Sequence, residues 1–468
     1  MRFDPRGEAR SAGRAATTGV IPGDVALSVG NPRSPLPEGW TWCQLTDFAR
    51  LETGHTPSRK HPEYWGGEVP WIGIRDATAN HGRTILKTEQ YTNHLGIENS
   101  SARILPANTV CLSRTASVGY VVVMGRPMAT SQDFVNWVCG AEIDYRFLKY
   151  VLMAERDAFL RFASGTTHQT IYFPEVKAFH VALPAVHVQR RIVETLSALD
   201  DRIDLLRQTN ATLESIAQAL FKSWFIDFDP VRAKAEGREP EGMDAATAAL
   251  FPGEFEQSAL GLIPKGWRRS SLAALADLNV ASWSARRAPT EVAYIDLAGV
   301  KANVFEPPQR YTFAAAPSRA RRELRVGDTL VATVRPGNRS FGFIAETEPG
   351  LTGSTGFAVL SPKSASFAPF VYLCATRDEN IDRLSALADG GAYPAVRPEL
   401  VQGTECVLPA EPVLDSFHSF AFPLLHCVSV NAQHARSLAE LRDTLLPRLI
   451  SGKLRLPECQ EQVQEAIA

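Results

Sequence analysis

The chain contains one pattern twice, and this restricts it to folds built from two similar halves. The Leu-Pro-Glu-Gly-Trp sequence at Leu36–Trp40 recurs as Ile-Pro-Lys-Gly-Trp at Ile263–Trp267. Each copy is followed by a stretch of mixed strand and helix patterns, and then by one long helical segment. A repeat of this length predicts a pair of domains rather than a solenoid of short stacked units. Two related domains suit a target that has two parts.

Further segments repeat in the same order. Residues 69–74 match 292–297, residues 108–110 match 328–330, and residues 131–135 match 354–358. The apolar residues of these segments recur, whereas the polar residues between them differ. We therefore expect two copies of one fold with two related specificities.

Length and composition indicate a globular chain. With 468 residues, 45% of them hydrophobic, the chain can bury two ordinary cores. No uninterrupted run of 18 apolar residues is present, and the first 35 residues lack the apolar centre of a signal peptide. An arginine-rich transit peptide is the weaker alternative, because Asp4 and Glu8 interrupt it. The seven cysteines are scattered without a Cys-x-x-Cys pair, which favours a reduced cytoplasm and predicts no metal site.

The net charge of −2 is unevenly distributed. Residues 227–256 hold eight acids and three bases, a net charge of −5, so the remainder of the chain carries −2 − (−5) = +3. This is far less basic than a DNA-binding protein that acts alone. We expect a partner to supply part of any affinity for nucleic acid.

The patterns predict an α+β fold with a pseudo-twofold internal repeat, in which two similar domains are joined by two long antiparallel coiled-coil helices. The expected segments are a disordered N-terminal extension (1–35), a first domain (36–185), a first long helix (186–226), an exposed linker (227–258), a second domain (259–410), a second long helix (411–452) and an acidic tail (453–468).

The two helical segments carry apolar residues at alternating spacings of three and four, the seam of a coiled coil. Asn210 lies in this seam, where a polar residue fixes the register of the helices. The alternative is that each helix packs on its own domain as an ordinary amphipathic helix. The seam residues are Leu196, Leu199, Ile203, Leu206, Asn210, Leu213 and Leu220 in the first helix, and Leu424, Val428, Asn431, Leu438 and Leu445 in the second.

Catalytic motifs are missing from the sequence. There is no phosphate-binding Gly-x-x-x-x-Gly-Lys-Ser/Thr loop. Glu175 and Lys177 form a Glu-x-Lys fragment of the kind found in nucleases, but a helix start with acidic charge in its first turn explains it better. We expect a chain without enzymatic activity or catalytic residues.

Polar and cationic residues cluster instead in loops that follow the predicted strands. Arginine can bind guanine through two hydrogen bonds, and hydroxyls or amides can bind phosphates or base edges. Arg114 and Arg335 are expected to follow matched strands. The candidate DNA-binding residues of the first domain are His55, Thr56, Ser58, Arg59, Lys60, Arg75, Asp76, Ser113, Arg114, Ser117, Gln132, Thr167, His168, Gln169 and Tyr172. Those of the second domain are Ser284, Arg286, Arg287, Arg335, Asn338, Arg339, Ser354, Tyr393 and Arg397.

The chain resembles the specificity subunits of type I restriction-modification systems from Leu36 to Leu456. The motifs Pro37–Trp40 and Pro264–Trp267 look like that family's domain-opening signature. The segments Leu220–Gly237 and Leu446–Leu454 are similar to those that end its two long helices. The long N-terminal extension and the more polar second seam depart from the family pattern.

The resemblance implies a non-catalytic subunit whose two target-recognition domains each read half of a bipartite, asymmetric DNA sequence. It also implies that the paired helices set the gap between the half-sites and dock two methyltransferase subunits, which use S-adenosylmethionine to methylate adenine. A restriction subunit that uses ATP and magnesium would join them in the cytoplasm. No cofactor is implied for this chain itself.

Two other classes of function stay open at this stage. One is a tandem DNA-binding module, either acting alone, which the near-neutral charge disfavours, or as part of a fused enzyme, which the missing catalytic motifs disfavour. The other is a structural adaptor whose two domains bind protein. Loop composition alone does not determine which bases are recognised.

Overall fold

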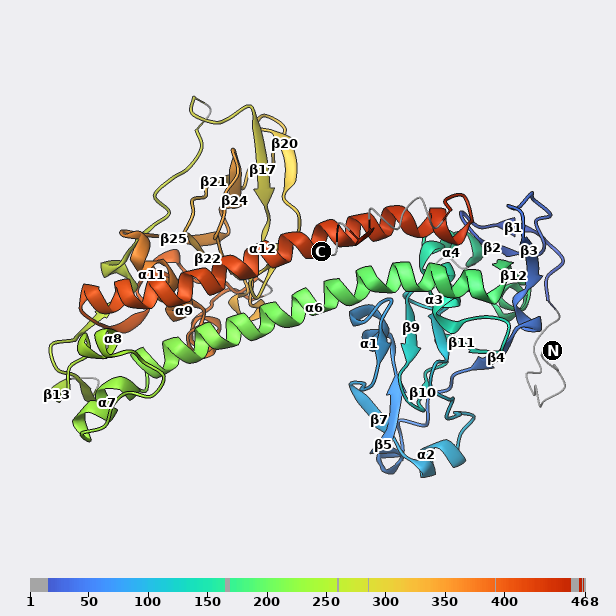
Figure 1. Ribbon diagram of the computed structural model, residues 1–468, viewed down its shortest axis with the longest axis horizontal. Helices are drawn as coiled ribbons and strands as arrows, with labels where there is room; N and C mark the ends of the chain where they lie inside the picture. The colour runs from blue at the N-terminus through green and yellow to red at the C-terminus, as the bar shows by residue number, and fades with distance from the viewer. Residues whose placement is uncertain are drawn as a thin grey trace. The chain divides into compact units, whose positions relative to one another are not determined.

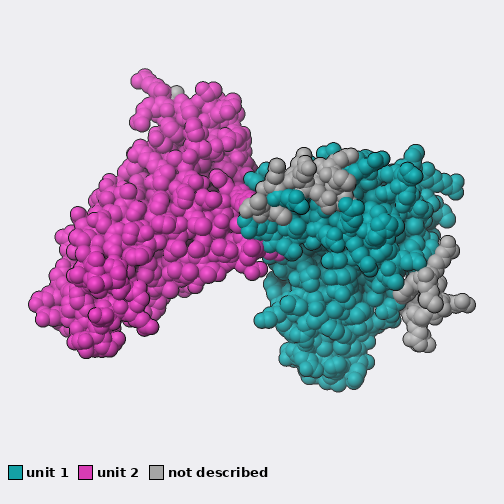
Figure 2. Space-filling view, viewed as in Figure 1, with its two compact units in different colours: residues 1–203, 437–468 teal, residues 204–436 magenta. Residues whose placement is uncertain are grey.

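The computed structural model describes residues 16–164, 169–258, 261–284, 286–391, 393–455, 463–464 and 466. The chain divides into two compact units, residues 1–203 with 437–468 and residues 204–436 (Figure 2). Each unit contains one domain of mixed strands and helices. Each also contains part of both long helices, α6 (Val186–Phe225) and α12 (Glu411–Ile450) (Figure 1). The α+β class and the two long helices are therefore confirmed.

The first unit is built around a five-stranded sheet in the order β4-β11-β8-β9-β6. The central strands β8 and β9 are buried along their whole length, as expected for strands covered on both faces. The strands of this sheet are β4 (Ala49–Thr53), β6 (Thr84–Ile85), β8 (Val110–Ser113), β9 (Val121–Met124) and β11 (Phe134–Cys139).

Two smaller sheets and five short helices complete the first domain. One sheet has the order β10-β5-β7, with β5 (Trp65–Ile72), β7 (Gln90–Thr92) and β10 (Ala129–Thr130). The other has the order β1-β2-β12-β3, with β1 (Ile21–Pro22), β2 (Leu27–Val29), β3 (Trp40–Gln44) and β12 (Phe179–Pro184). The helices are α1 (Ile74–Ala79), α2 (His94–Glu98), α3 (Tyr145–Ala154), α4 (Phe159–Phe162) and α5 (Phe173–Lys177).

The second unit has a four-stranded sheet in the order β16-β25-β22-β23 and another in the order β20-β17-β24-β21. Their strands are β16 (Ala276–Leu278), β17 (Glu291–Ile295), β20 (Gln309–Thr312), β21 (Ala320–Glu323), β22 (Thr329–Ala332), β23 (Phe341–Phe343), β24 (Leu351–Ser354) and β25 (Phe357–Pro362). Three strand pairs or hairpins contain β13 (Phe255–Ser258), β14 (Gly261–Pro264), β15 (Arg268–Ser271), β18 (Val300–Lys301), β19 (Val304–Phe305) and β26 (Glu405–Leu408). The helices are α7 (Asp229–Ala235), α8 (Ala245–Ala249), α9 (Ala368–Thr376), α10 (Asp378–Ala386) and α11 (Pro398–Gln402).

Strand pairing shows that the two units share one fold. In the first unit β8 lies between β11 and β9, and in the second β22 lies between β25 and β23. A parallel pair, which is rarer than an antiparallel one, also recurs as β5 with β10 and β17 with β24. The internal repeat seen in the sequence is therefore a repeat of topology.

The repeated Gly-Trp motif packs each domain against the end of a long helix. Trp40 lies against Gly452, just after α12, where an added Cβ would collide with the indole ring. The ring centroid of Trp267 lies 6.0 Å from that of Phe225, the last residue of α6, and 6.2 Å from that of Phe251. The motif therefore recurs because each unit closes in the same way.

The two long helices contact each other within each unit. In the second unit, Asn210 donates to the Val428 carbonyl (2.9 Å) and accepts from the Asn431 amide (2.9 Å), so two polar seam residues satisfy each other. In the first unit, Arg442 donates to Asp200 (2.8 Å). Leu424 is only half-buried and the neighbouring Leu425 is buried in its place. This local shift corrects one seam position.

Helix α12 is also long and apolar enough, by length and composition, to cross a membrane. One such helix is weak evidence for a membrane protein, because the core helices of soluble proteins pass the same test. In the second unit, Phe417, Ala421 and Leu425 of α12 are buried in one core with Ala217, Phe221 and Trp224 of α6.

The prediction of a disordered extension at residues 1–35 is wrong for residues 21–29, and residues 1–15 lie outside the described part. Strand β2 pairs with β12, and Leu27 and Val29 are buried. The carboxylate of Glu155, which is fully buried, accepts the backbone amides of residues 24–27 at 2.6–3.0 Å. Local patterns could not predict this order, because the stabilising group lies 128 to 131 residues away.

The segment predicted as an exposed linker, 227–258, is also folded in large part. It contains α7, α8 and β13, and its Phe228, Val231 and Phe251 are buried in the core of the second unit. Trp224 and Phe251 meet edge to face with ring centroids 5.0 Å apart. Composition suggested exposure, but these few aromatic residues decide the packing. Most of the predicted acidic tail, 453–468, lies outside the described residues.

Candidate functional site

In the first unit, three loops with candidate residues meet at one end of the central sheet, where β4 and β8 end and β11 begins. Strand β11 runs antiparallel to both of its neighbours, with Val135 opposite Thr53 and Phe134 opposite Ser113. The segments after β4 and after β8 therefore lie beside the segment before β11. This end of the sheet brings together residues 54–60, 114–117 and 131–133.

The first of these loops is held close to the sheet. The His55 amide donates to the Thr130 carbonyl (2.9 Å), and the Thr56 hydroxyl donates to the side chain of Gln132. Any side chain at Gly54 would collide with the Ser131 carbonyl, so glycine permits this close approach. Ser58, Arg59 and Lys60 then extend from the loop as exposed residues.

Arg114 is half-buried and used within the protein. Its guanidinium donates to the carbonyls of Gln132 (3.1 Å) and Ile171 (3.5 Å) and lies over the Phe173 ring, 4.7 Å from the centroid. Burial lowers the pKa of Arg114 from its usual value. Arg114 therefore ties three segments together, and the expectation that it reads DNA does not fit this geometry.

Three other candidates in the first unit also have structural roles. Asp76 is buried, and its two carboxylate oxygens accept the amides of Gly73 (2.9 Å) and Glu89 (2.8 Å). Ser113 is fully buried and donates to the Ser117 carbonyl (2.5 Å). These contacts correct the prediction for Asp76 and Ser113, and place Ser117 in the same tight turn.

The remaining candidates of this unit lie at the surface. Gln132, Gln169 and Tyr172 are exposed on or next to the converging loops. Arg75 is 87% exposed and lies 3.8 Å from Glu89. Thr167 and His168 lie outside the described residues. The exposed set remains a prediction of DNA contact.

In the second unit, Arg335 lies at the matching end of the sheet. Val331 and Ala332 of β22 face Ala358 and Phe357 of β25, so residues 333–339 follow the strand at the same end. Arg335 is exposed, with a left-handed backbone (φ 47°), and its guanidinium lies 4.8 Å from the ring centroid of the exposed Tyr393. An exposed cation on an aromatic ring suits contact with a nucleic acid.

The other candidates of the second unit fall into two groups. Ser354 is fully buried and accepts from the Gly356 amide (3.3 Å), so its predicted role in DNA contact is wrong. Arg339 forms an ion pair with Asp378, which leaves it less available than expected. Ser284, Arg286, Arg287, Asn338 and Arg397 are exposed and remain candidates.

The structure corrects the match between Arg114 and Arg335 by two residues. The Ile171 amide donates to the backbone carbonyl of Arg114 (2.9 Å), as the Val396 amide does to that of Thr333 (2.9 Å). The isolated bridge of Thr115 with Thr170 likewise corresponds to that of Val334 with Ala395. Arg335 therefore corresponds to Ala116, which is also left-handed (φ 65°). The Ile344 amide donates to the Asp328 carbonyl (2.9 Å), as the Met124 amide does to the Thr109 carbonyl (3.0 Å). Asp328 therefore corresponds to Thr109 rather than to Asn108.

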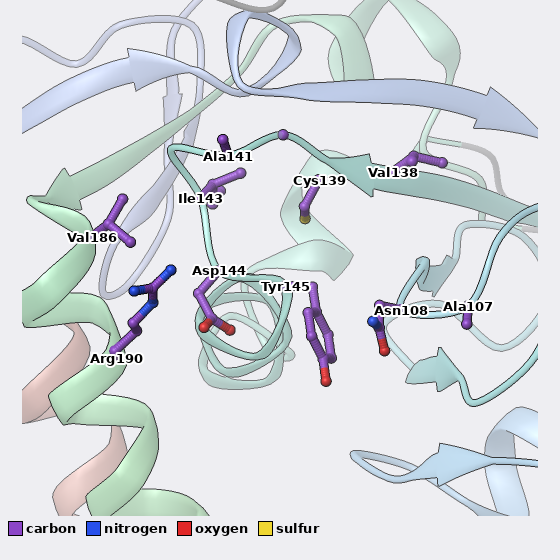
Figure 3. Close-up of a pocket in the computed structure, with 11 residues that line it drawn as sticks. Ala107, Asn108, Val138, Cys139, Ala141, Ile143, Asp144, Tyr145, Val186 and Arg190 are labelled. Carbon is purple, nitrogen blue, oxygen red and sulfur yellow. The ribbon is translucent and has the colours of Figure 1, made fainter. Parts of the chain in front are cut away.

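A separate pocket of about 320 Å³ lies at the opposite end of the first unit's sheet (Figure 3). It is lined by Cys139, Asp144 and Arg190, among others. Burial raises the pKa of Cys139 to about 12, so its thiol is a poor nucleophile at neutral pH. Asp144 caps α3 through the Arg146 amide (2.8 Å). The described residues contain no cluster of three His, Cys, Asp or Glu that could hold a metal ion.

Comparison with known proteins gives one family match. The family described as "Type I restriction modification DNA specificity domain" matches residues 37–215. The type I restriction enzyme MjaIX specificity subunit of Methanocaldococcus jannaschii is 24% identical over 429 residues, covering 90% of this chain and 95% of that protein. The type I restriction enzyme HindI specificity subunit of Haemophilus influenzae is 26% identical over 336 residues, covering 62% of this chain and 72% of the relative.

A solved structure supports the fold. The S subunit of a type I restriction-modification system from M. genitalium superimposes with a TM-score of 0.54 at 15% identity, covering 90% of this chain and 97% of that one. At this identity the likeness concerns the fold alone.

Proposed function

We propose, since this chain belongs to the family of type I restriction-modification specificity subunits, that it recognises a two-part DNA sequence with one unit for each part. The family consists of recognition subunits and not of enzymes. The observation that carries the proposal is that the same end of the sheet carries the candidate loops in both units. The same strands present loops in both units, but the exposed side chains on those loops differ.

The chain is proposed to act within a larger complex. Specificity subunits of this family act with DNA and with the other restriction-modification subunits. The near-neutral charge supports this, because a chain with a net charge of −2 supplies little of the electrostatic attraction that DNA binding needs. We propose that two methyltransferase subunits supply S-adenosylmethionine-dependent adenine methylation, that a restriction subunit supplies the ATP- and magnesium-dependent steps, and that the complex works in the cytoplasm.

The domain limits are proposed from the matched strands. The first recognition domain lies within residues 36–185 and the second within 259–410. The structure adds residues 21–29 to the first unit and residues 228–258 to the second, since both segments carry buried residues.

Domain exchange tests this function. Residues 40–180 would be replaced by those of another family member, and the chain co-expressed with its methyltransferase subunits. Sequencing of methylated bases should show that one half of the target changes while the other half and the spacer stay the same. The matched exchange of residues 268–404 should change the other half. If both halves changed together in an active complex, the assignment of one unit to each half would be wrong.

A further inference from the structure

We propose that Arg59 reads a guanine in the half-site recognised by the first unit, and that Trp65, Trp71 and Gln90, here called the reading platform, position it. This inference rests on the proposed DNA-recognition function and deepens it by naming the base. The sequence placed Arg59 among fifteen equivalent candidates of its domain. The structure separates it from the others.

The reading platform contacts the Arg59 guanidinium through two aromatic rings and one hydrogen bond. The Arg59 Cζ atom lies 3.9 Å from the centroid of the Trp65 ring and 5.2 Å from that of Trp71. Its Nη2 atom donates to Gln90 Oε1 at 2.6 Å. One face of the guanidinium is therefore covered by an aromatic ring, and one of its five N–H donors is satisfied by a neutral amide.

The platform and the loop also fix each other. Trp71 Nε1 donates to the His55 carbonyl (3.1 Å), and Trp65 Nε1 donates to the Ser58 carbonyl (3.4 Å). The two indole rings meet edge to face, 5.2 Å apart. Because the loop backbone and the rings are tied together, little side-chain freedom remains for Arg59 to lose on binding.

The chemistry left exposed matches guanine. Guanine presents two acceptors, O6 and N7, in the major groove, and a planar guanidinium can donate to both at once. Arg59 is exposed and borders an open recess of about 340 Å³ that is also lined by Trp65, Glu89, Gln90 and Tyr91. The Glu89 carboxylate lies 3.8 Å from the Arg75 guanidinium. No acidic side chain is bonded to Arg59, so its charge is not already neutralised by an ion pair among the described residues.

The second unit carries a different group at the same place. Trp71 faces Gln90 across β5 and β7, and Tyr294 faces Gln309 across β17 and β20, so the two glutamines are equivalent. Gln309 Oε1 accepts from the Tyr311 hydroxyl (2.5 Å) rather than from an arginine. The framework thus keeps a glutamine at this position and changes the group bonded to it, as expected where the two units read different bases.

The test uses the complete complex with its methyltransferase subunits and a duplex that carries its own target. Each guanine of the first half-site would be replaced in turn by 7-deazaguanine, which lacks the N7 acceptor. One replacement should weaken binding of the natural complex about tenfold. The complex with Arg59→Ala should bind more weakly and no longer respond to that replacement. A first half-site without a guanine on either strand, or an unchanged response in Arg59→Ala, would overturn the proposal.

Further variants separate base reading from its alternatives. Arg59→Lys keeps the charge but not the paired donors, so it should relax the same base position while retaining the salt dependence of binding. If Arg59→Ala instead weakens all sequences equally and reduces the salt slope by about one, Arg59 contacts a phosphate and the proposal fails. Trp65→Phe should largely rescue the base preference that Trp65→Ala loses, because the ring positions the guanidinium.

Arg126→Ala provides a matched control. Arg126 is an exposed arginine of the same unit that donates to the Glu68 carbonyl (3.4 Å), and its guanidinium has no ring contact among the described residues. Its removal should leave the methylated sequence unchanged. If the natural complex showed no sequence preference at all, the proposed function itself would fail. If it kept its preference while Arg59→Ala had the same target, only this inference would fail.

Discussion

The loops after β8 and β22 show how one framework gives an arginine two different roles. In the first unit, Arg114 continues directly from its strand and points under the loop, where two carbonyls and the Phe173 ring hold it. In the second unit, the equivalent position is Thr333, and Arg335 follows two residues later in an exposed turn over Tyr393. A shift of two positions thus separates an internal anchor from a candidate DNA contact. Two arginines that follow matched strands therefore need not have equivalent roles.

The largest expected effect comes from the helices that both units share. Helices α6 and α12 each contain 40 residues. Adding seven residues to each, at matching places, keeps the seam and lengthens each helix by about 10.5 Å, or roughly three base pairs. If the helices set the spacer, sequencing of methylated DNA should show a longer spacer between unchanged half-sites. The three base pairs also rotate one half-site by about 100°, which would limit activity. An unchanged spacer in an active variant would contradict the prediction that the helices set the spacer.

Replacing Arg335 by alanine should affect DNA binding and leave the fold intact. The side chain is exposed, so thermal unfolding of the variant should match that of the natural chain. DNA affinity should fall by roughly 1–3 kcal/mol, with relaxed preference at one base of the second half-site only. Titration with duplexes that differ in each half-site measures both effects. No loss of affinity would remove Arg335 from the interface.

The corresponding change at Arg114 should have the opposite character. Arg114→Ala removes hydrogen bonds to two carbonyls, and we expect the first unit to lose about 1.5 kcal/mol of unfolding free energy. Chemical denaturation measures this loss. Any weaker DNA binding should be the same for all sequences. A base-specific loss at unchanged stability would restore Arg114 as a reader and remove the contrast between the units.

The smallest expected effect concerns Asp328 at the start of β22, where the first unit has the neutral Thr109. Burial raises the pKa of Asp328 to about 6 from 3.8, and its Oδ1 atom has no hydrogen-bond partner. Because the folded chain holds this proton more tightly, the stability from Asp328 is complete below about pH 4 and is lost as the pH rises through 6. Asp328→Asn should stabilise the second unit on the order of 1 kcal/mol at pH 8. Thermal unfolding at pH 8 and pH 4 checks this, since equal gains at both pH values would exclude titration of Asp328 as the cause.

Several parts of the site were within reach of the sequence. The repeated segments predicted the matched strands, and a glycine-rich or polar segment after each strand marked the loops at their ends. Three candidates nevertheless proved buried: Asp76, Ser113 and Ser354. A polar residue that leaves a strand has the same appearance in a sequence whether it bonds to the backbone beside it or points outward, so composition could not separate the two cases. The platform under Arg59 was missed because Trp65 and Gln90 are distant in sequence and meet only through strand pairing.

By itself, the sequence determined the duplication, the class of fold and the two long helices, because apolar spacing is a local property that each segment carries in its own residues. It also carried the resemblance to the specificity subunits, through motifs such as Pro37–Trp40 that pack a domain against a helix end. The tertiary structure alone decided that Glu155 would order residues 24–27, that Arg114 would be an anchor, and that Arg59 would be held on an indole ring. The contacts of Glu155 and Arg114 join segments that are distant in the chain, and Arg59, although it is near Trp65 in sequence, is also bonded to the distant Gln90. Such contacts are set by strand register, and a shift of one residue turns a side chain to the other face of the sheet.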